Sequence, residues 1–296
     1  MKKPIVTGDA LEAIIAQHPT PFHIYSEAGI RGTARALQGA FAWNAGFKEY
    51  FAVKATPNPA ILKILRQEGC GVDCASLTEL MLAEACGFKG HEIMFSSNVT
   101  PAEEYAYAAK LGAIINLDDI SHIDFLERAA GKIPQTICCR YNPGGDFKIH
   151  NKIMDSPKDA KYGFTKQQLR EGYVRLRAKG TRAFGLHAFL ASNTLGDEYY
   201  PVLARELFEV AVWLKEETGI ALGFINLSGG VGIPYRPEDA MPDITAIGRG
   251  VQKAFDEVLA PAGLGGVAIF TELGHFVLGP NGQLVATVLH KKQIYK

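Results

Sequence analysis

The sequence lacks long apolar runs, a charge imbalance and a secretory signal. No window reaches the ~20 apolar residues of a membrane-spanning helix, and no long apolar core follows the lysines at the N-terminus. The 31 basic residues are balanced by 31 acidic ones, so the charge gives no case for binding nucleic acid or an anionic membrane surface. We therefore expect a cytoplasmic protein with no nucleic-acid or membrane partner.

Cysteine is also scarce. The five cysteines are an odd number and lie mostly in apolar patterns: Cys70, Cys74, Cys86, Cys138 and Cys139. Without a secretory signal, buried reduced thiols are favoured over disulfides. Three residues separate Cys70 from Cys74, but no second pair with suitable spacing follows, so we expect no metal site.

From residue 49 onward, apolar runs alternate with helical patterns. The eight candidate strands are Tyr50–Val53, Gly71–Cys74, Ile93–Ser96, Ala113–Leu117, Thr136–Tyr141, Ala183–Phe189, Phe224–Leu227 and Val267–Thr271. Helical patterns between them include the run of Ile61, Leu62, Ile64 and Leu65 and the segments Ser76–Cys86, Pro101–Leu111, Ile120–Ala130, Lys166–Lys179, Tyr199–Glu217 and Ile244–Leu259. Near-continuous apolar strands separated by helices predict an α/β protein with a closed (β/α)8 TIM barrel. A doubly wound open sheet is the alternative, but no Gly-x-Gly-x-x-Gly turn follows the first strand.

Two segments outside this repeat are also predicted to be strands. Thr20–Tyr25 precedes the barrel and Gly282–His290 follows it. The last residues, Lys291–Tyr295, have the character of the middle of an element rather than its end.

Lys54 follows the aromatic and β-branched run that ends at Pro57, in Tyr50–Asn58. At the carboxyl end of a buried strand a lysine lies on the rim where barrels keep their sites, and its amine is a candidate nucleophile. Taken alone, Lys54 is more simply interpreted as a solvated charge on the rim.

Other polar residues follow the remaining strands and would meet Lys54 on the same rim. They include Asp73, Arg140, Phe189, Ser192, Ser228, Gly229, Gly230, Glu272 and His275. The bare backbone of the Ser228-Gly229-Gly230 turn can approach a phosphate, although a tight turn alone explains the glycines equally well. An amine, a lone carboxylate, an aromatic plate and such a turn are the parts that hold pyridoxal 5'-phosphate.

The same residues stand in motifs that resemble the fold-type III pyridoxal phosphate decarboxylases, most strongly diaminopimelate decarboxylase. The matching motifs are Tyr50–Asn58, Val72–Glu79, Ile93–Val99, Lys161–Phe164, Gly185–Asn193, Asn226–Tyr235 and Glu272–Phe276. The resemblance implies that Lys54 forms the Schiff base with the cofactor and that Glu272 pairs with the pyridine nitrogen. It places Ser192 and the Ser228 to Gly230 turn on the phosphate.

The resemblance also places Asp73 near the cofactor and Arg140 beneath its ring. Alternatives from the residues themselves are a helix-capping role for Asp73 and a structural ion pair for Arg140. Two departures concern the family pattern: Phe189 stands where the family has a stacking histidine, and His275 stands where it has an arginine.

The resemblance implies three segments: residues 1–30 belonging to a β-domain, a cofactor barrel over 31–280, and the start of a truncated C-terminal β-domain over 281–296. In the family that domain carries a cysteine and a tyrosine that reach the neighbouring subunit's site, so a homodimer is also implied. The expected activity is that of a carboxy-lyase in lysine biosynthesis, converting meso-diaminopimelate to L-lysine.

Other substrates in the family are carboxynorspermidine, ornithine and arginine. A non-catalytic barrel that carries pyridoxal phosphate is a second hypothesis, and a remnant that binds no cofactor and exposes strand edges is a third.

Overall fold

The computed structural model describes residues 4–146, 160–190, 192–236 and 238–295. Eight parallel strands form a closed barrel, in which β2 pairs with both β3 and β9. They are β2 (Lys48–Ala52), β3 (Gly71–Cys74), β4 (Ile93–Phe95), β5 (Ile114–Leu117), β6 (Thr136–Tyr141), β7 (Ala183–Ala188), β8 (Phe224–Asn226) and β9 (Ala268–Thr271). The predicted (β/α)8 barrel is confirmed, and the closing β2–β9 pair rules out the open sheet.

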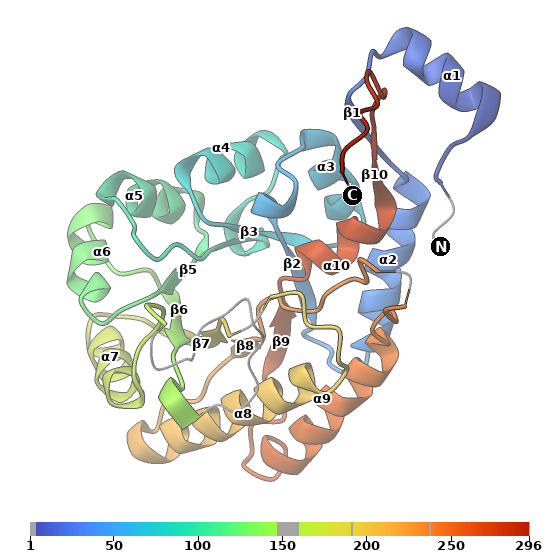
Figure 1. The fold of residues 1–296 in the computed structure, drawn as a ribbon. Helices are drawn as coiled ribbons and strands as arrows, with labels where there is room; N and C mark the ends of the chain where they lie inside the picture. Colours follow the sequence, from blue (N-terminus) through green and yellow to red (C-terminus); the bar gives the residue numbers. More distant parts are fainter. Residues whose placement is uncertain (1–3, 147–159, 191, 237, 296) are drawn as a thin grey trace.

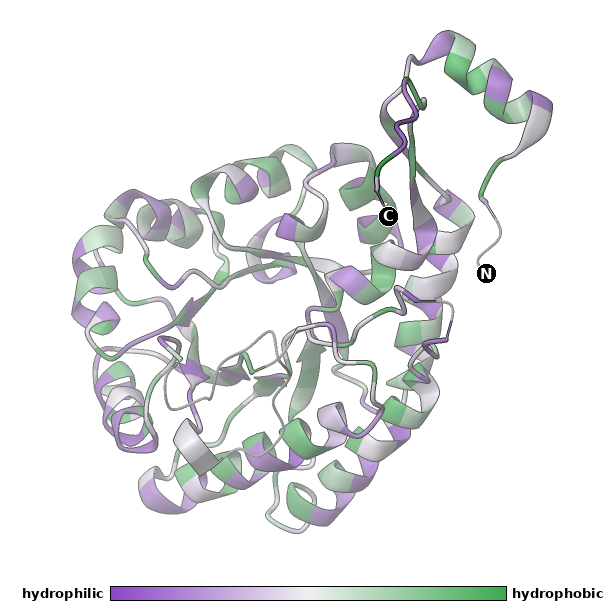
Figure 2. Cartoon of the chain, viewed as in Figure 1, coloured by the Kyte–Doolittle hydropathy of each residue, from purple (hydrophilic) through white to green (hydrophobic). Residues whose placement is uncertain are grey.

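Helices surround the barrel as a ring (Figure 1). In chain order they are α2 (Glu27–Ala40), α3 (Pro59–Gln67), α4 (Leu77–Ala85), α5 (Ala102–Leu111), α6 (His122–Ala130), α7 (Lys166–Ala178), α8 (Tyr199–Thr218) and α9 (Ile244–Val258). Figure 2 shows hydrophobic and hydrophilic residues alternating along these helices, as expected for elements with one face on the barrel and one in water. Among the residues that the structure describes, no helix combines the length and apolarity needed to cross a membrane.

The barrel interior has two layers of different character. The lower layer is an apolar cluster of Tyr50, Met94, Ile114, Cys138, Phe224 and Phe270. Two residues further along their strands, and therefore on the same inward face, come the buried polar residues Asn116, Arg140 and Asn226. The barrel interior is therefore filled by an apolar layer of side chains, and a polar layer lies above it at the carboxyl ends of the strands.

Gly185 makes the lower layer possible, because a Cβ there would lie 2.0 Å from the ring of Phe224. The freed space lets Phe224 stack on Phe270, with ring centroids 4.7 Å apart.

A small antiparallel sheet stands outside the ring of helices, beside α2 and α10 (Gly274–Leu278), with α1 (Gly8–Gln17) beyond it (Figure 1). Strand β1 (Phe22–Tyr25) pairs with β10 (Gly282–Val285), so both predicted flanking strands exist and are each other's partner. The prediction of a strand up to His290 is wrong, because residues 286–295 form no helix or strand. The division into segments at residues 30 and 280 stays a prediction.

The remaining differences from the sequence prediction are small. Several strands end one residue earlier than predicted, and α1, α2 and α10 have no counterpart among the predicted elements. The five cysteines are buried and free, as expected for reduced thiols.

Candidate active site

A pocket of about 480 Å³ opens where the carboxyl ends of β2, β7, β8 and β9 meet the small β1–β10 sheet. Most of the predicted site residues line it: Lys54, Phe189, Ser192, Ser228, Gly229, Gly230, Glu272 and His275. Asp73 and Arg140 do not line it and lie buried in the barrel interior. The outer wall comes from His23 and Tyr25 of β1 and from Gln283 and Leu284 around β10, which the sequence did not indicate as site residues.

Lys54 lies just past β2, in a single 3-10 turn over Val53–Ala55. The turn forms here because Pro57 follows closely and Asn58 caps α3, with Pro59 at the first helical position. The side chain of Lys54 is exposed to the pocket, and its Nζ lies 5.4 Å from the centre of the Phe189 ring. Its amine is therefore available to a ligand.

Phe189 is the aromatic face of the pocket. It follows β7, and Tyr162 packs edge-on against it with ring centroids 5.5 Å apart. This support holds the ring as a plate against which a flat ligand can lie, although a phenyl ring offers no hydrogen bond.

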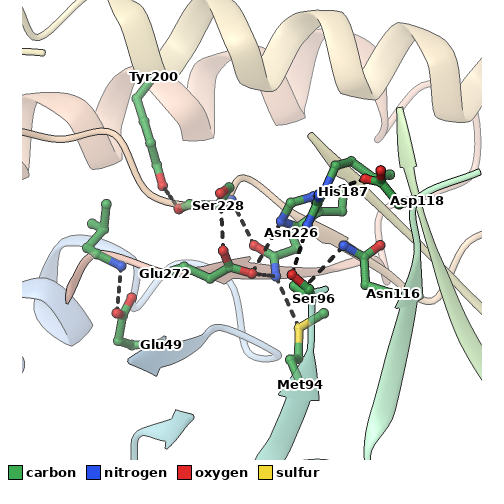
Figure 3. Close-up of polar contacts among 12 residues, drawn as sticks. Glu49, Met94, Ser96, Asn116, Asp118, His187, Tyr200, Asn226, Ser228 and Glu272 are labelled. Carbon is green, nitrogen blue, oxygen red and sulfur yellow. Dashed lines mark hydrogen bonds and ion pairs between the residues drawn. The ribbon is translucent and has the colours of Figure 1, made fainter. Parts of the chain in front are cut away.

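Glu272 follows β9 and is nine-tenths buried. Asn226 Nδ2 donates to Oε1 at 2.8 Å, and Ser228 Oγ donates to Oε2 at 3.1 Å (Figure 3). Burial alone would raise the pKa of this carboxyl, but His187, Arg140 and Asn226 together lower it below its ordinary value. The carboxylate is held ionised at the edge of the pocket, with lone pairs left for a ligand.

Asp73 is also a buried carboxyl, but its pKa is raised, whereas that of Glu272 is lowered. It lies in β3, its Oδ1 is buried without a hydrogen-bond partner among the described residues, and burial together with the charge of Glu272 raises its pKa well above the ordinary value. Two buried carboxyls near each other favour one shared negative charge. That charge lies on Glu272. The capping alternative for Asp73 is wrong, because Ser76 caps α4.

Arg140 lies in β6 behind the pocket. Its Nη1 donates to Asp118 Oδ1 at 2.7 Å, its Nε donates to His187 Nδ1 at 3.2 Å, and its Nη2 donates to the carbonyl of Ser96 at 3.2 Å. The ion-pair interpretation of Arg140 therefore describes its direct contacts. The pair faces the polar layer, where His187 lies between Arg140 and Glu272, and the charge of Arg140 also lowers the pKa of Glu272 directly.

The turn after β8 needs glycine for space. A Cβ on Gly229 would lie 2.9 Å from the carbonyl oxygen of Glu272, and Gly230 has a φ of 113°. Ser228 adopts a φ of 60° and its hydroxyl donates to Glu272, while the Gly229–Gly230 backbone presents an edge without side chains to the pocket. The structure thus links Ser228 to the carboxylate, a contact that the sequence did not predict.

His275 occupies the first turn of α10, and its Nε2 lies 2.7 Å from the hydroxyl of Tyr235. Partial burial lowers the pKa of His275, so the ring is neutral at pH 7. No arginine is among the described residues that line the pocket. The polar contact at this point is a neutral hydrogen-bonding pair.

Glu49 supports the site from behind and was not predicted. It is 2% exposed, its Oε1 accepts from the backbone N–H of Leu273 at 2.7 Å, and its Oε2 lies 2.5 Å from Thr271 Oγ1. These two contacts flank Glu272 on either side in the chain. Burial raises the pKa of Glu49 to about 8.

The donor set fits an aldehyde cofactor that carries a ring nitrogen and a phosphate. One pocket is surrounded by an accessible amine, an ionised buried carboxylate, an aromatic face and a glycine edge, where a Cβ on Gly229 would meet the carbonyl oxygen of Glu272. In the described part of the chain, no three His, Cys, Asp or Glu side chains gather where a metal ion would bind.

The barrel and its rim define a pyridoxal phosphate-binding barrel as the class of protein. Residues 27–279 match the family described as pyridoxal-dependent decarboxylase, pyridoxal binding domain, and the chain belongs to this family.

Curated relatives and solved structures agree with this family. Protein TabA of Pseudomonas amygdali pv. tabaci is 37% identical over 95% of this chain and 65% of its own length. Diaminopimelate decarboxylase of Methanothermobacter thermautotrophicus is 29% identical over 98% of this chain and 67% of its own length. The crystal structure of diaminopimelate decarboxylase from M. jannaschii in complex with L-lysine superposes with a TM-score of 0.87 at 25% identity, covering 97% of this chain and 68% of that one. The chain spans about two thirds of the length of these relatives.

Proposed function

We propose that this chain binds pyridoxal 5'-phosphate and serves the decarboxylation of a diamino acid, with meso-diaminopimelate as the first substrate to test. The observation that carries the proposal is the presence in one pocket of the exposed amine of Lys54 and the ionised, buried carboxylate of Glu272. The substrate assignment is supported by the diaminopimelate decarboxylases among its relatives.

Each residue has a defined part in this proposal. Lys54 supplies the amine that binds the aldehyde, Glu272 accepts a hydrogen bond from a protonated ring nitrogen, Phe189 lies against the ring, and the Gly229–Gly230 backbone with Ser192 takes the phosphate. When bound, the cofactor accepts the electron pair that remains on the substrate when its carboxylate leaves. Keeping Glu272 ionised is the contribution of the protein to that step.

The pocket walls orient the substrate and limit its contact with water. Leu278 and Leu284 give the pocket apolar surface, while His275 and Gln283 offer neutral hydrogen-bonding groups. A homodimer, a place in lysine biosynthesis and a cytoplasmic location stay predictions from the sequence.

Covalent trapping tests the cofactor assignment. Protein mixed with pyridoxal phosphate and reduced with borohydride should carry a phosphopyridoxyl group on the peptide containing Lys54, as read by mass spectrometry. Lys54→Ala should lose the adduct and keep its fold, since the side chain is exposed, and Lys253→Ala on the outer face of α9 is the matched control. An adduct of equal yield in Lys54→Ala would refute the assignment.

Release of carbon dioxide from meso-diaminopimelate tests the reaction. Turnover that is lost in Lys54→Ala supports the decarboxylase, and ornithine, arginine and carboxynorspermidine are the comparison substrates. An adduct on Lys54 without turnover of any of them would instead favour the non-catalytic carrier.

A further inference from the structure

A row of buried polar side chains crosses the barrel interior from the end of β5 to the end of β9. Asp118, Arg140, His187 and Glu272 are 5%, 5%, 1% and 9% exposed. Strand register sets part of this row, because Arg140 is aligned with His187 and His187 with Asn226 on adjacent strands. Figure 3 shows His187 between Asp118 on one side and the Asn226–Glu272 pair on the other.

The contacts within the row fix the proton on His187. Arg140 Nε is always a donor, so His187 Nδ1, at 3.2 Å, must accept with its lone pair. Burial lowers the pKa of His187 and outweighs the opposite effect of Glu272, and the permanent charge of Arg140 also opposes a second proton, so the ring is neutral. Its single proton therefore lies on Nε2.

That proton faces Glu272. His187 Nε2 lies 3.3 Å from Glu272 Oε1, but this buried nitrogen makes no hydrogen bond to any described residue, so its alignment with Glu272 falls short of one. Catalytic hydrogen bonds that are loose without ligand often tighten when the ligand binds. Asp118 acts at the far end, where its 2.7 Å ion pair holds Arg140 in place.

We propose that His187 is a positioning residue that keeps Glu272 ionised and correctly aimed, and that Arg140 and Asp118 act by fixing the proton on His187 Nε2. The proposal rests on the proposed function, because the task of Glu272 is to meet the ring nitrogen of the cofactor. A purely structural network would show the same tautomer, but it would not link His187 to kcat or to the absorption band of the bound cofactor.

The first test needs no cofactor. In protein labelled with 15N-histidine, the His187 signal, assigned by its loss in His187→Gln, should show a protonated Nε2 and an unprotonated Nδ1 throughout the neutral pH range. A ring protonated on Nδ1, or on both nitrogens, would overturn the proposal. This result stands whether or not the protein binds pyridoxal phosphate.

The second test compares two variants. In His187→Gln the amide can still accept from Arg140 and donate to Glu272, whereas His187→Leu keeps most of the volume and removes both bonds. With the cofactor added, His187→Leu should lose roughly 100-fold in kcat, the effect of a misplaced catalytic group, with little change in KM. It should also change the visible absorption band of the bound cofactor.

His187→Gln should retain the parent band and most of the parent kcat. Equal kcat and equal absorption bands in the two variants would overturn the proposal. If His187→Leu fails to fold, the proposal is judged by the tautomer of His187 and by the visible absorption band of His187→Gln with the cofactor bound. Absence of an adduct on Lys54 in the parent protein is a separate result, which refutes the proposed function and leaves the tautomer measurement to judge His187.

Discussion

Glu49→Gln should remove a large pH dependence from the stability of this protein. Glu49 is buried between β2 and β9, and its two oxygens meet one donor, the N–H of Leu273, and one group that can accept, the hydroxyl of Thr271. The hydroxyl of Thr271 donates to Glu49 Oε2 in the structure, and because a hydroxyl can also accept, a neutral carboxylic acid keeps both contacts by donating its own O–H to Thr271. Glutamine has the same donor and acceptor in the same places and no charge.

The magnitude follows from the pKa of Glu49, which burial raises from 4.5 to about 8. The folded protein then binds this proton more tightly than the unfolded chain, so stability is greatest at acidic pH and falls as the pH rises from about 4.5 to about 8. Over that whole window the contribution amounts to about 5 kcal/mol. Glu49→Gln has no such contribution.

Urea unfolding at a series of pH values measures this difference. Subtracting the parent free energy of unfolding from that of Glu49→Gln should give a curve that rises in favour of the variant across the same window, with unchanged m-values. Glu209→Gln, at an exposed position on α8, is the control, and its difference curve is the baseline for that of Glu49→Gln. A flat difference curve for Glu49→Gln would show that Glu49 has the same pKa in the folded and unfolded protein and would refute the reasoning.

Two further changes test the barrel interior by the same unfolding assay. Gly185→Ala places a Cβ 2.0 Å from the Phe224 ring and should lower the free energy of unfolding by roughly 1–3 kcal/mol or more. Gly223→Ala, whose Cβ has its nearest neighbour at 3.8 Å, should lower it by less than about 1 kcal/mol. Equal losses in the two variants would contradict the packing argument. Asp118→Asn leaves the buried charge of Arg140 without its partner and should cost about 3–5 kcal/mol, and a loss below 1 kcal/mol would mean that the ion pair contributes little.

The rim of the barrel was predictable because it depends on local sequence. An apolar run that stops at Pro57 marks the end of a strand, and whatever follows it lies on the rim. That is why the sequence alone places Lys54, Glu272 and the aromatic face of Phe189 at one site.

The polar layer behind the rim was not predictable, because it depends on register between strands. Nothing near His187 in the sequence shows that Arg140 and Asn226 lie beside it. Glu49 gave a weak signal as an acid beside an apolar run, but only the β2–β9 pairing explains its burial. Helix α2 was missed because glycines interrupt its pattern, and its apolar face on the barrel compensates for their low helix propensity.

The β1–β10 sheet makes the pocket wall depend on two strands from distant parts of the chain. Phe22 is aligned with Val285, and the residues that face the pocket from this sheet include Tyr25 and Gln283. The entropy lost on closing a loop grows only slowly with loop length, but contacts between strands far apart in the chain, such as β1 and β10, form slowly. During synthesis the N-terminal strand must therefore wait, unpaired, until the whole barrel has left the ribosome. Until β10 has been made, the pocket has no outer wall.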